Sequence, residues 1–196
     1  MAFDALSDAS DEALLVLYAN GDAGGARLLT ARLAPRILGY AARLLQDRAE
    51  AEDVAQDAML RLWRIAPEWR QGEAKVATWL YRVVTNLCND RLRARQRRKL
   101  MALDDAPEIE DGAAKPEALL MQADRLAALN AALSALPVRQ REAVVLRHIE
   151  GLTNPEIATV MDIGLEAVES LTARGKRALS ALLSGQREDL GYEEEY

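Results

Sequence analysis

The chain has 196 residues, of which 50% are hydrophobic and 5% aromatic, and its formal net charge is −6. This length allows one large domain or two small ones with real cores, and the scarcity of aromatic residues favours helices over sheets. The single cysteine, Cys88, excludes an internal disulfide, and the single histidine, His148, leaves too few ligands for a structural zinc site, so no metal or cofactor is expected.

No segment has the character of a signal peptide or a membrane span. The first residues, MAFDALSDASDEALL, lack a basic start and an apolar run, and no stretch approaches about 18 consecutive apolar residues. We therefore expect no membrane insertion and a cytoplasmic protein.

The N-terminal stretch predicts two helices joined by a short turn. Ser10 or Asp8 caps the first helix, Asp11–Ala19, whose acidic first turn suits a helix N-terminus. The second helix, Ala23–Leu45, keeps an apolar stripe along its length, and Pro35 is expected to bend it.

The next predicted helix, Asp47–Trp69, has two usable faces. One is an apolar stripe for burial, made of Ala51, Val54, Ala55, Ala58, Leu62 and Ile65. The neighbouring face mixes carboxylate, amide and large apolar groups that a partner protein can bind, namely Asp53, Gln56, Asp57, Leu60 and Trp63. The alternative is a surface helix in which Trp63 simply closes the core.

A loop and a basic helix follow. Pro, Gly and charged residues break the helical pattern over Pro67–Lys75. A helix then begins at or near Thr78 and runs to about Arg98, with Trp79 on its packing side. One acid, Asp90, is outnumbered there by the bases Arg82, Arg91, Arg93, Arg95, Arg97, Arg98 and Lys99. The net negative charge of the whole chain therefore hides a basic helix that could bind the phosphates of a nucleic acid. The alternative is that these bases simply form a solvated helix end.

The remaining chain reads as a linker followed by further helices. The stretch LDDAPEIEDGAAKP, residues 103–116, is rich in acids, Pro, Gly and Ala and has too little apolar periodicity to pack. Helices are predicted over Glu117–Ala135 and Val138–Ile149, with Pro137 and Gly151 at their ends.

The last two predicted helices have the plan of a helix-turn-helix motif. Thr153 and Glu156 have capping-box spacing at the start of a short helix, Asn154–Met161. A turn containing Gly164 then leads to a longer helix, Leu165–Leu183, which can enter a major groove.

Two stretches resemble conserved regions of bacterial sigma factors of the extracytoplasmic-function type. AEDVAQDAMLRLW followed by WLYRVVTNLCNDRLRARQRRK is similar to region two, and LPVRQREAVVLRHIEGLTNPEIATVMDIGLEAVESL is similar to region four. The resemblance implies an all-α fold with two helical domains and a flexible acidic linker. Its parts are region 2 (residues 1–98), the linker (99–116), region 4 (117–184) and an acidic tail (185–196).

The same resemblance implies roles for individual residues in region 2. Those that match polymerase-contacting positions are Asp53, Gln56, Asp57, Met59 and Trp63, with Leu60 exposed beside them. Trp69, Arg70 and Asn86 match positions that bind a flipped minus-10 base, and Lys75 lies in the same loop. Phosphate contacts are expected from Arg91, Arg93, Arg95, Arg97 and Arg98. The alternatives are loop packing for Trp69 and a polar surface position for Asn86.

The region 4 helix is expected to read the minus-35 duplex with some departures from the family pattern. Its candidate contacts are Glu166, Glu169, Ser170, Ala173, Arg174, Lys176 and Arg177. The family usually has basic residues where this chain has Glu169 and Leu171. We therefore expect Glu169 to accept a hydrogen bond from a cytosine amino group.

The expected function is that of an alternative sigma factor, monomeric when free of partners, which binds core RNA polymerase and promoter DNA and is controlled by an anti-sigma factor. The main alternative is a sigma-like mimic that sequesters an anti-sigma factor, but such mimics resemble a sigma factor joined to a receiver domain, for which no room exists. A plain helix-turn-helix repressor leaves the polymerase-like face unexplained. An enzyme is not expected, because no phosphate-binding Gly loop, nucleophile elbow or metal cluster is present.

Overall fold

The computed structural model describes residues 8–70, 72, 75–101 and 117–184, except for the side chains of residues 117–124. Every regular element in these ranges is a helix, which confirms the all-α prediction. The predicted acidic tail lies outside the described residues, as does the predicted linker apart from its first three residues, 99–101.

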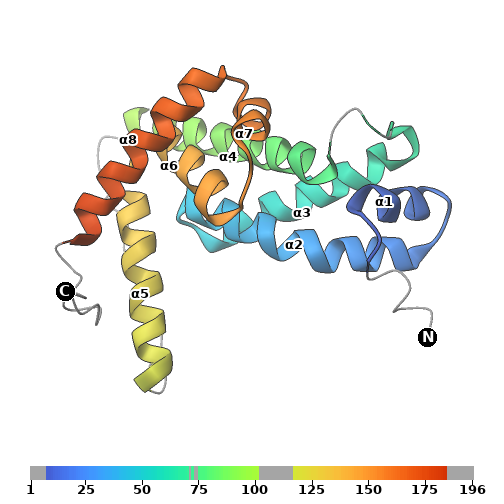
Figure 1. Ribbon diagram of the computed structural model, residues 1–196, viewed down its shortest axis with the longest axis horizontal. Coiled ribbons are helices and arrows are strands. Elements are labelled where there is room, and N and C mark those ends of the chain that lie inside the picture. The colour runs from blue at the N-terminus through green and yellow to red at the C-terminus, as the bar shows by residue number, and fades with distance from the viewer. Residues whose placement is uncertain (1–7, 71, 73–74, 102–116, 185–196) are drawn as a thin grey trace.

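The N-terminal half is a bundle in which α2 contacts α1, α3 and α4 (Figure 1). Its elements are α1 (Asp11–Ala19), α2 (Ala23–Leu45), α3 (Arg48–Ile65), the 3₁₀ turn η2 (Ala66–Glu68) and α4 (Val76–Met101). The side chains of Ser10, Asp22 and Asp47 each accept a backbone N–H at the start of the helix that they precede. Local capping therefore fixes where the first three helices begin.

One predicted boundary was wrong by a few residues, and a second, predicted at or near Thr78, lies two residues earlier. The helix predicted over Asp47–Trp69 ends at Ile65, because Pro67 lies in the 3₁₀ turn that follows. Helix α4 begins two residues before Thr78, at Val76, whose backbone N–H donates to Oε1 of Glu12 at 3.0 Å. This contact between α1 and α4 could not be read from local sequence.

The C-terminal half consists of α5 (Glu117–Ser134), α6 (Val138–Val144), the π-helical turn η3 (Val145–Ile149), α7 (Asn154–Met161) and α8 (Leu165–Ser184). The predicted capping box of Thr153 and Glu156 is present at the start of α7. The helix predicted over Val138–Ile149 widens in its last turn, where the N–H of Glu150 donates to the carbonyl of Val145 at 3.0 Å. In Figure 1, α5 projects away from the rest of the molecule.

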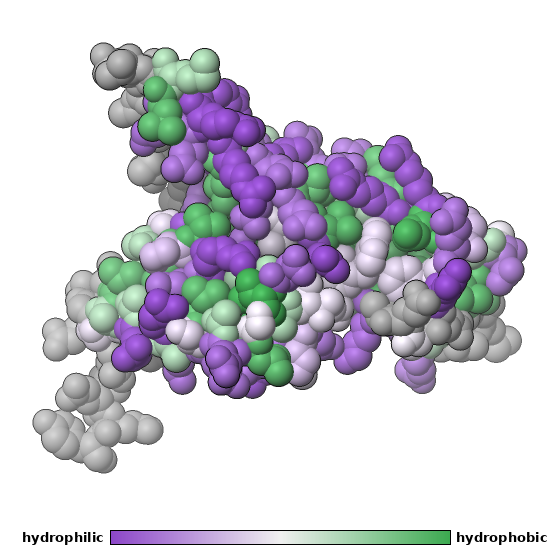
Figure 2. Space-filling model, turned by 90° about the horizontal axis from the view of Figure 1, so that it is seen from above, coloured by the Kyte–Doolittle hydropathy of each residue, from purple (hydrophilic) through white to green (hydrophobic). Residues whose placement is uncertain are grey.

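The surface is predominantly polar on the face shown in Figure 2, with smaller apolar patches between hydrophilic residues. Large apolar side chains that are exposed include Leu60 on α3 and Leu165 at the start of α8. Among the described residues, no helix combines the length and apolar character needed to cross a membrane.

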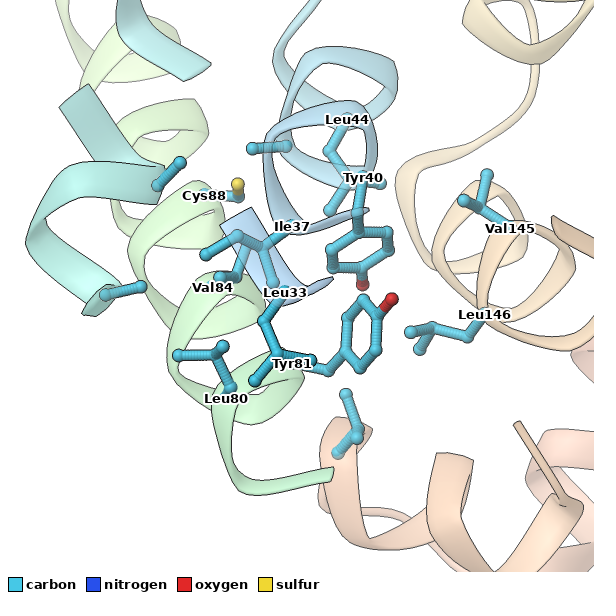
Figure 3. Packing of buried hydrophobic residues seen from close by; sticks show 14 of the residues in the cluster. Leu33, Ile37, Tyr40, Leu44, Leu80, Tyr81, Val84, Cys88, Val145 and Leu146 are labelled. Atoms are coloured by element: carbon cyan, nitrogen blue, oxygen red, sulfur yellow. The ribbon is translucent and has the colours of Figure 1, made fainter. Parts of the chain in front are cut away.

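Buried residues of both halves form one hydrophobic cluster. Tyr40 of α2 and Tyr81 of α4 pack edge to face with ring centroids 5.4 Å apart. Figure 3 shows Val145 and Leu146 of η3 facing these rings from the C-terminal half. The two halves are therefore packed against each other through a shared core.

Candidate partner-binding and nucleic-acid-binding surfaces

The exposed face of α3 carries most of the predicted polymerase contacts. The side chain of Asp53 is 70% exposed, Gln56 is exposed, and Leu60 is 47% exposed. Asp57 pairs with Arg61 one turn later at 3.0 Å, an exposed pair of the kind that contributes little to stability. The face thus combines acids, an amide and an apolar residue that a partner can desolvate.

Two residues predicted for this face are less accessible than the others. Met59 is only 7% exposed and belongs to the core, because its position turns it toward the buried stripe of α3. Trp63 is half-buried, and its ring lies 4.7 Å from that of Tyr18 of α1. The interpretation of Trp63 as a residue that closes the core is therefore partly correct.

The loop after α3 presents Trp69 as a packed residue. Its ring meets that of Trp79 edge to face at 6.0 Å, and its indole Nε1 is buried without a hydrogen-bond partner among the described residues. Arg70 beside it is exposed. A base that stacks on Trp69 would have to use the part of the indole that Trp79 leaves accessible.

Only part of the predicted basic cluster presents its charge to solvent. Arg93, Arg97 and Arg98 are exposed on α4, and Arg93 lies 3.5 Å from Asp90. Exposed arginines along one helix can neutralise successive phosphates and give salt-dependent binding. These three residues are therefore the best-placed phosphate contacts in the cluster.

Arg91 and Arg95 instead brace α4 against the start of α3. Arg91 donates to the carbonyl of Glu50 at 3.0 Å, and Arg95 donates to the carbonyl of Leu45 at 2.7 Å. The guanidinium of Arg95 also lies 3.0 Å from Asp47 and 3.1 Å from Glu50. Local sequence does not reveal this bracing, because the acids lie more than 40 residues earlier, at and near the start of α3.

Asn86 lies on the exposed side of α4 beside a cavity of about 490 Å³ between the two halves. The cavity is lined by Thr85, Asn86, Asn89, Leu92, Arg93 and Gln96 of α4, by Val138 and Arg139 of α6, and by Val160, Met161 and Asp162 at the end of α7. The amide of Asn86 has the donor and acceptor needed to read a base edge, but it faces a cavity that α7 partly covers.

Lys75 is committed to an ion pair in this structure. Its ammonium lies 2.8 Å from Oε1 of Glu156, the capping-box residue of α7. Hydrogen bonding to Glu156 raises the pKa of Lys75, and the same bond is the main reason why the pKa of Glu156 is lowered to about 2. No local pattern could predict this pair, since 81 residues separate its members.

The predicted minus-35 contacts share one accessible face of α8. All of them are exposed: Glu166, Glu169, Ser170, Ala173, Arg174, Lys176 and Arg177. The guanidinium of Arg174 donates to the carbonyl of Ser170 at 3.2 Å, so it lies along the helix surface.

The opposite face of α8 packs on α6. Val168 and Gly175 are buried, and Leu171 is packed against the core. A Cβ on Gly175 would lie only 2.5 Å from Cγ2 of Val144, so glycine permits the close approach of the two helices. Leu171, which is partly buried, therefore has a packing role in this chain.

No group of three or more His, Cys, Asp or Glu side chains in the described ranges could bind a metal ion. Cys88 is buried, and burial raises the pKa of its thiol to about 12. This thiol is therefore neither a metal ligand nor a reactive nucleophile.

Comparison with known families assigns both halves. The model of sigma-70 region 2 matches residues 29–98, and the model of sigma-70, region 4 matches residues 126–179. Among curated relatives, the RNA polymerase sigma-H factor of Pseudomonas aeruginosa is 33% identical over 186 residues, which cover 91% of this chain and 96% of that protein. The ECF RNA polymerase sigma factor SigM of Mycobacterium tuberculosis is 34% identical over 184 residues, which cover 93% and 89%.

Solved structures share the fold at lower identity. The sigma factor RpoE of Bartonella quintana, in complex with the anti-sigma factor NepR, has a TM-score of 0.66 and 20% identity over 81% of this chain and 96% of that chain. CnrH in complex with the cytosolic domain of CnrY has a TM-score of 0.65 and 24% identity over 89% and 97%. The two matched regions and the curated relatives that are 33% and 34% identical show that the chain belongs to the sigma-70 family, as an RNA polymerase sigma factor of the extracytoplasmic-function type.

Proposed function

We propose that this sigma factor binds core RNA polymerase with the exposed face of α3, captures the minus-10 element with α4 and the loop before it, and reads the minus-35 element with α8. One observation gives this proposal its main support. The exposed acidic and apolar face of α3 lies beside the basic helix α4, and α8 of region 4 (α5–α8) exposes a separate polar face. The proposed polymerase contacts are Asp53, Gln56, Asp57, Leu60 and Trp63, with Met59 supporting them from the core.

Region 2 (α1–α4) would act on the minus-10 element through differential affinity. Members of this family are not enzymes, so promoter opening must come from tighter binding of the unpaired strand than of the duplex. The proposed base contacts are Trp69, Arg70, Lys75 and Asn86, and the proposed phosphate contacts are Arg93, Arg97 and Arg98. Arg91 and Arg95 position α4.

An anti-sigma factor is a further proposed partner. Leu60 and the partly exposed Trp63 give the α3 face apolar area that a regulatory protein could cover in competition with polymerase. One of the solved structures named above is a complex of a sigma factor with the anti-sigma factor NepR, which supports this proposal at the level of the fold. We propose a monomer in the cytoplasm when neither partner is bound.

The test is a comparison of three variants with purified core polymerase. Asp53→Ala should weaken core binding, because it removes a 70% exposed acid from the α3 face. Asn86→Ala should leave core binding intact and reduce strand opening, measured by permanganate reactivity of unpaired thymines. Glu52→Gln is the matched control, because Glu52 pairs with Arg48 on the same helix at 2.9 Å and has no proposed contact. If all three variants bound core polymerase and opened the promoter as well as the parent, the proposal would be contradicted.

A further inference from the structure

A cavity of about 460 Å³ between α2 and α5 takes no part in the proposed polymerase and promoter contacts. Its walls include apolar side chains of both helices, namely Pro35, Leu38 and Ala42 of α2 and Leu126 of α5. Leu126 is 50% exposed, so the described residues leave part of this wall uncovered. The cavity, named here the α2–α5 groove, therefore offers an apolar surface to an occupant.

Arg43 brings a positive charge to the α2–α5 groove and forms no ion pair within the described part of the chain. Asp47, the acid that lines the groove, instead lies 3.0 Å from Arg95. The guanidinium of Arg43 lies over Gly39, with Nη1 only 2.9 Å from the position that a Cβ would occupy there. This cation is therefore available to an acidic occupant of the groove.

Two polar atoms of groove residues have unfilled hydrogen-bonding capacity. Nε of Arg43, a donor, and Oδ1 of Asn130, an acceptor, are buried without a hydrogen-bond partner among the described residues. Asn130 lies one helical turn after Leu126, so both residues are on the same side of α5. An occupant that reached these atoms would offset the cost of burying them unpaired. The groove thus suits an occupant that combines a carboxylate, an apolar body and a hydrogen-bond donor.

Residues 185–196, which lie outside the described residues, have this composition. One base, Arg187, is outnumbered there by the acids Glu188, Asp189, Glu193, Glu194 and Glu195, and apolar or aromatic residues are interleaved at Leu190, Tyr192 and Tyr196. A tyrosine ring can cover an apolar wall while its hydroxyl donates a hydrogen bond, and a glutamate can accept a charge-assisted hydrogen bond from arginine. The acidic stretch 103–116 has no aromatic residue and lacks this combination.

The end of α8 places this segment within reach of the groove. Helix α5 contacts both α8 and α2, and Figure 1 shows the end of α8 beside α5. Helix α8 ends at Ser184, and Tyr192 follows it by eight residues, a length of up to about 27 Å. A helix is only about 10–12 Å across, so the segment is long enough to pass around α5 and enter the groove.

We propose that residues 188–196 of this chain dock in the α2–α5 groove, with the ring of Tyr192 against the apolar wall and the carboxylates of Glu193 and Glu194 at Arg43. The docked segment would cover Leu126 and connect α8, α5 and α2. The groove shares no residue with the proposed polymerase, minus-10 or minus-35 contacts, so this inference goes beyond the proposed function and does not depend on it.

The charge of Arg43 can be removed or reversed to test this docking. Arg43→Gln deletes the cation and should lower the ratio of docked to undocked molecules by roughly twofold to fivefold. Arg64→Gln is the matched control, because Arg64 is exposed on α3 and does not line the groove. Arg43→Glu should undock the segment, and adding Glu193→Arg and Glu194→Arg to that variant should restore docking. This rescue separates lost attraction from damage to α2.

Distances between spin labels on Thr30→Cys and Tyr196→Cys would measure docking in the full-length chain. Thr30 is exposed on α2, and the buried Cys88 thiol should remain unlabelled. We expect a narrow distance distribution in the parent, the control and the rescued variant, and a broad one in Arg43→Gln and Arg43→Glu. A broad distribution in the parent, or an unchanged one in Arg43→Glu, would overturn the proposal. A narrow distribution that disappeared on dilution with excess unlabelled chain would also overturn it, because a second copy would then be the occupant.

Discussion

Replacing Arg95 with alanine separates a structural role from a DNA-binding role within one basic helix. The substitution removes hydrogen bonds from the guanidinium to Leu45, Asp47 and Glu50, at 2.7, 3.0 and 3.2 Å. It also leaves two carboxylates at the start of α3 without their shared cation. We therefore expect the variant to lose stability in the absence of DNA.

The expected loss follows from these three contacts. A net contribution of roughly 1 kcal/mol for each hydrogen bond, discounted because one third of the side chain is exposed, gives about 2 kcal/mol. For a chain of this size that corresponds to a melting temperature lower by about 4–8 °C. Thermal unfolding followed by circular dichroism measures this change directly.

Arg97→Ala is the matched comparison, because Arg97 is exposed near the end of the same helix. It should keep the parent melting temperature. The salt dependence of promoter binding by the holoenzyme should show about one fewer counterion released than in the parent. Arg95→Ala should show the reverse, with lowered stability and an unchanged salt slope. An unchanged melting temperature for Arg95→Ala, with a reduced salt slope, would refute the bracing role.

Three further substitutions test the packing and the chemistry. Burial raises the pKa of Glu142, so its stabilising contribution is greatest below the usual glutamate pKa and decreases as pH rises above it. Glu142→Gln should flatten this decrease when urea unfolding is followed upward from pH 4.5, and an unchanged slope would contradict the reasoning. Gly175→Ala places a Cβ about 2.5 Å from Cγ2 of Val144, so the steric strain should exceed the gain in helix propensity. We expect the free energy of unfolding to fall by about 1 kcal/mol, and an unchanged value would show that α6 moves to make room. Glu169→Gln should change the base selected at one minus-35 position in a randomised promoter library, and unchanged selection would exclude cytosine recognition.

Local signals predicted most of the fold because helix caps act within one turn. Ser10 and the Thr153 and Glu156 pair begin their helices as predicted. The helical period also predicted the buried stripe of α3 with two exceptions: Ile65, at the end of the helix, is only partly buried, and Met59, which was not assigned to the stripe, is buried. Pro67 shortened the predicted helix through an effect that the sequence already contained.

The candidate site was less predictable because its electrostatics are non-local. Arg91 and Arg95 read as free phosphate ligands in the sequence, but acids and carbonyls near the start of α3 satisfy them. Lys75 likewise finds its partner 81 residues away. Charge patterning along one helix cannot reveal such pairs, since they depend on how two helices or two regions pack.

Transcription by the purified protein with core RNA polymerase, on fragments selected from a random promoter library, tests the central claim most directly. We expect transcripts with defined start sites that require the protein, together with weaker core binding in Asp53→Ala and reduced strand opening in Asn86→Ala. A folded protein that neither binds core polymerase nor yields a specific transcript would contradict the assignment of these surfaces.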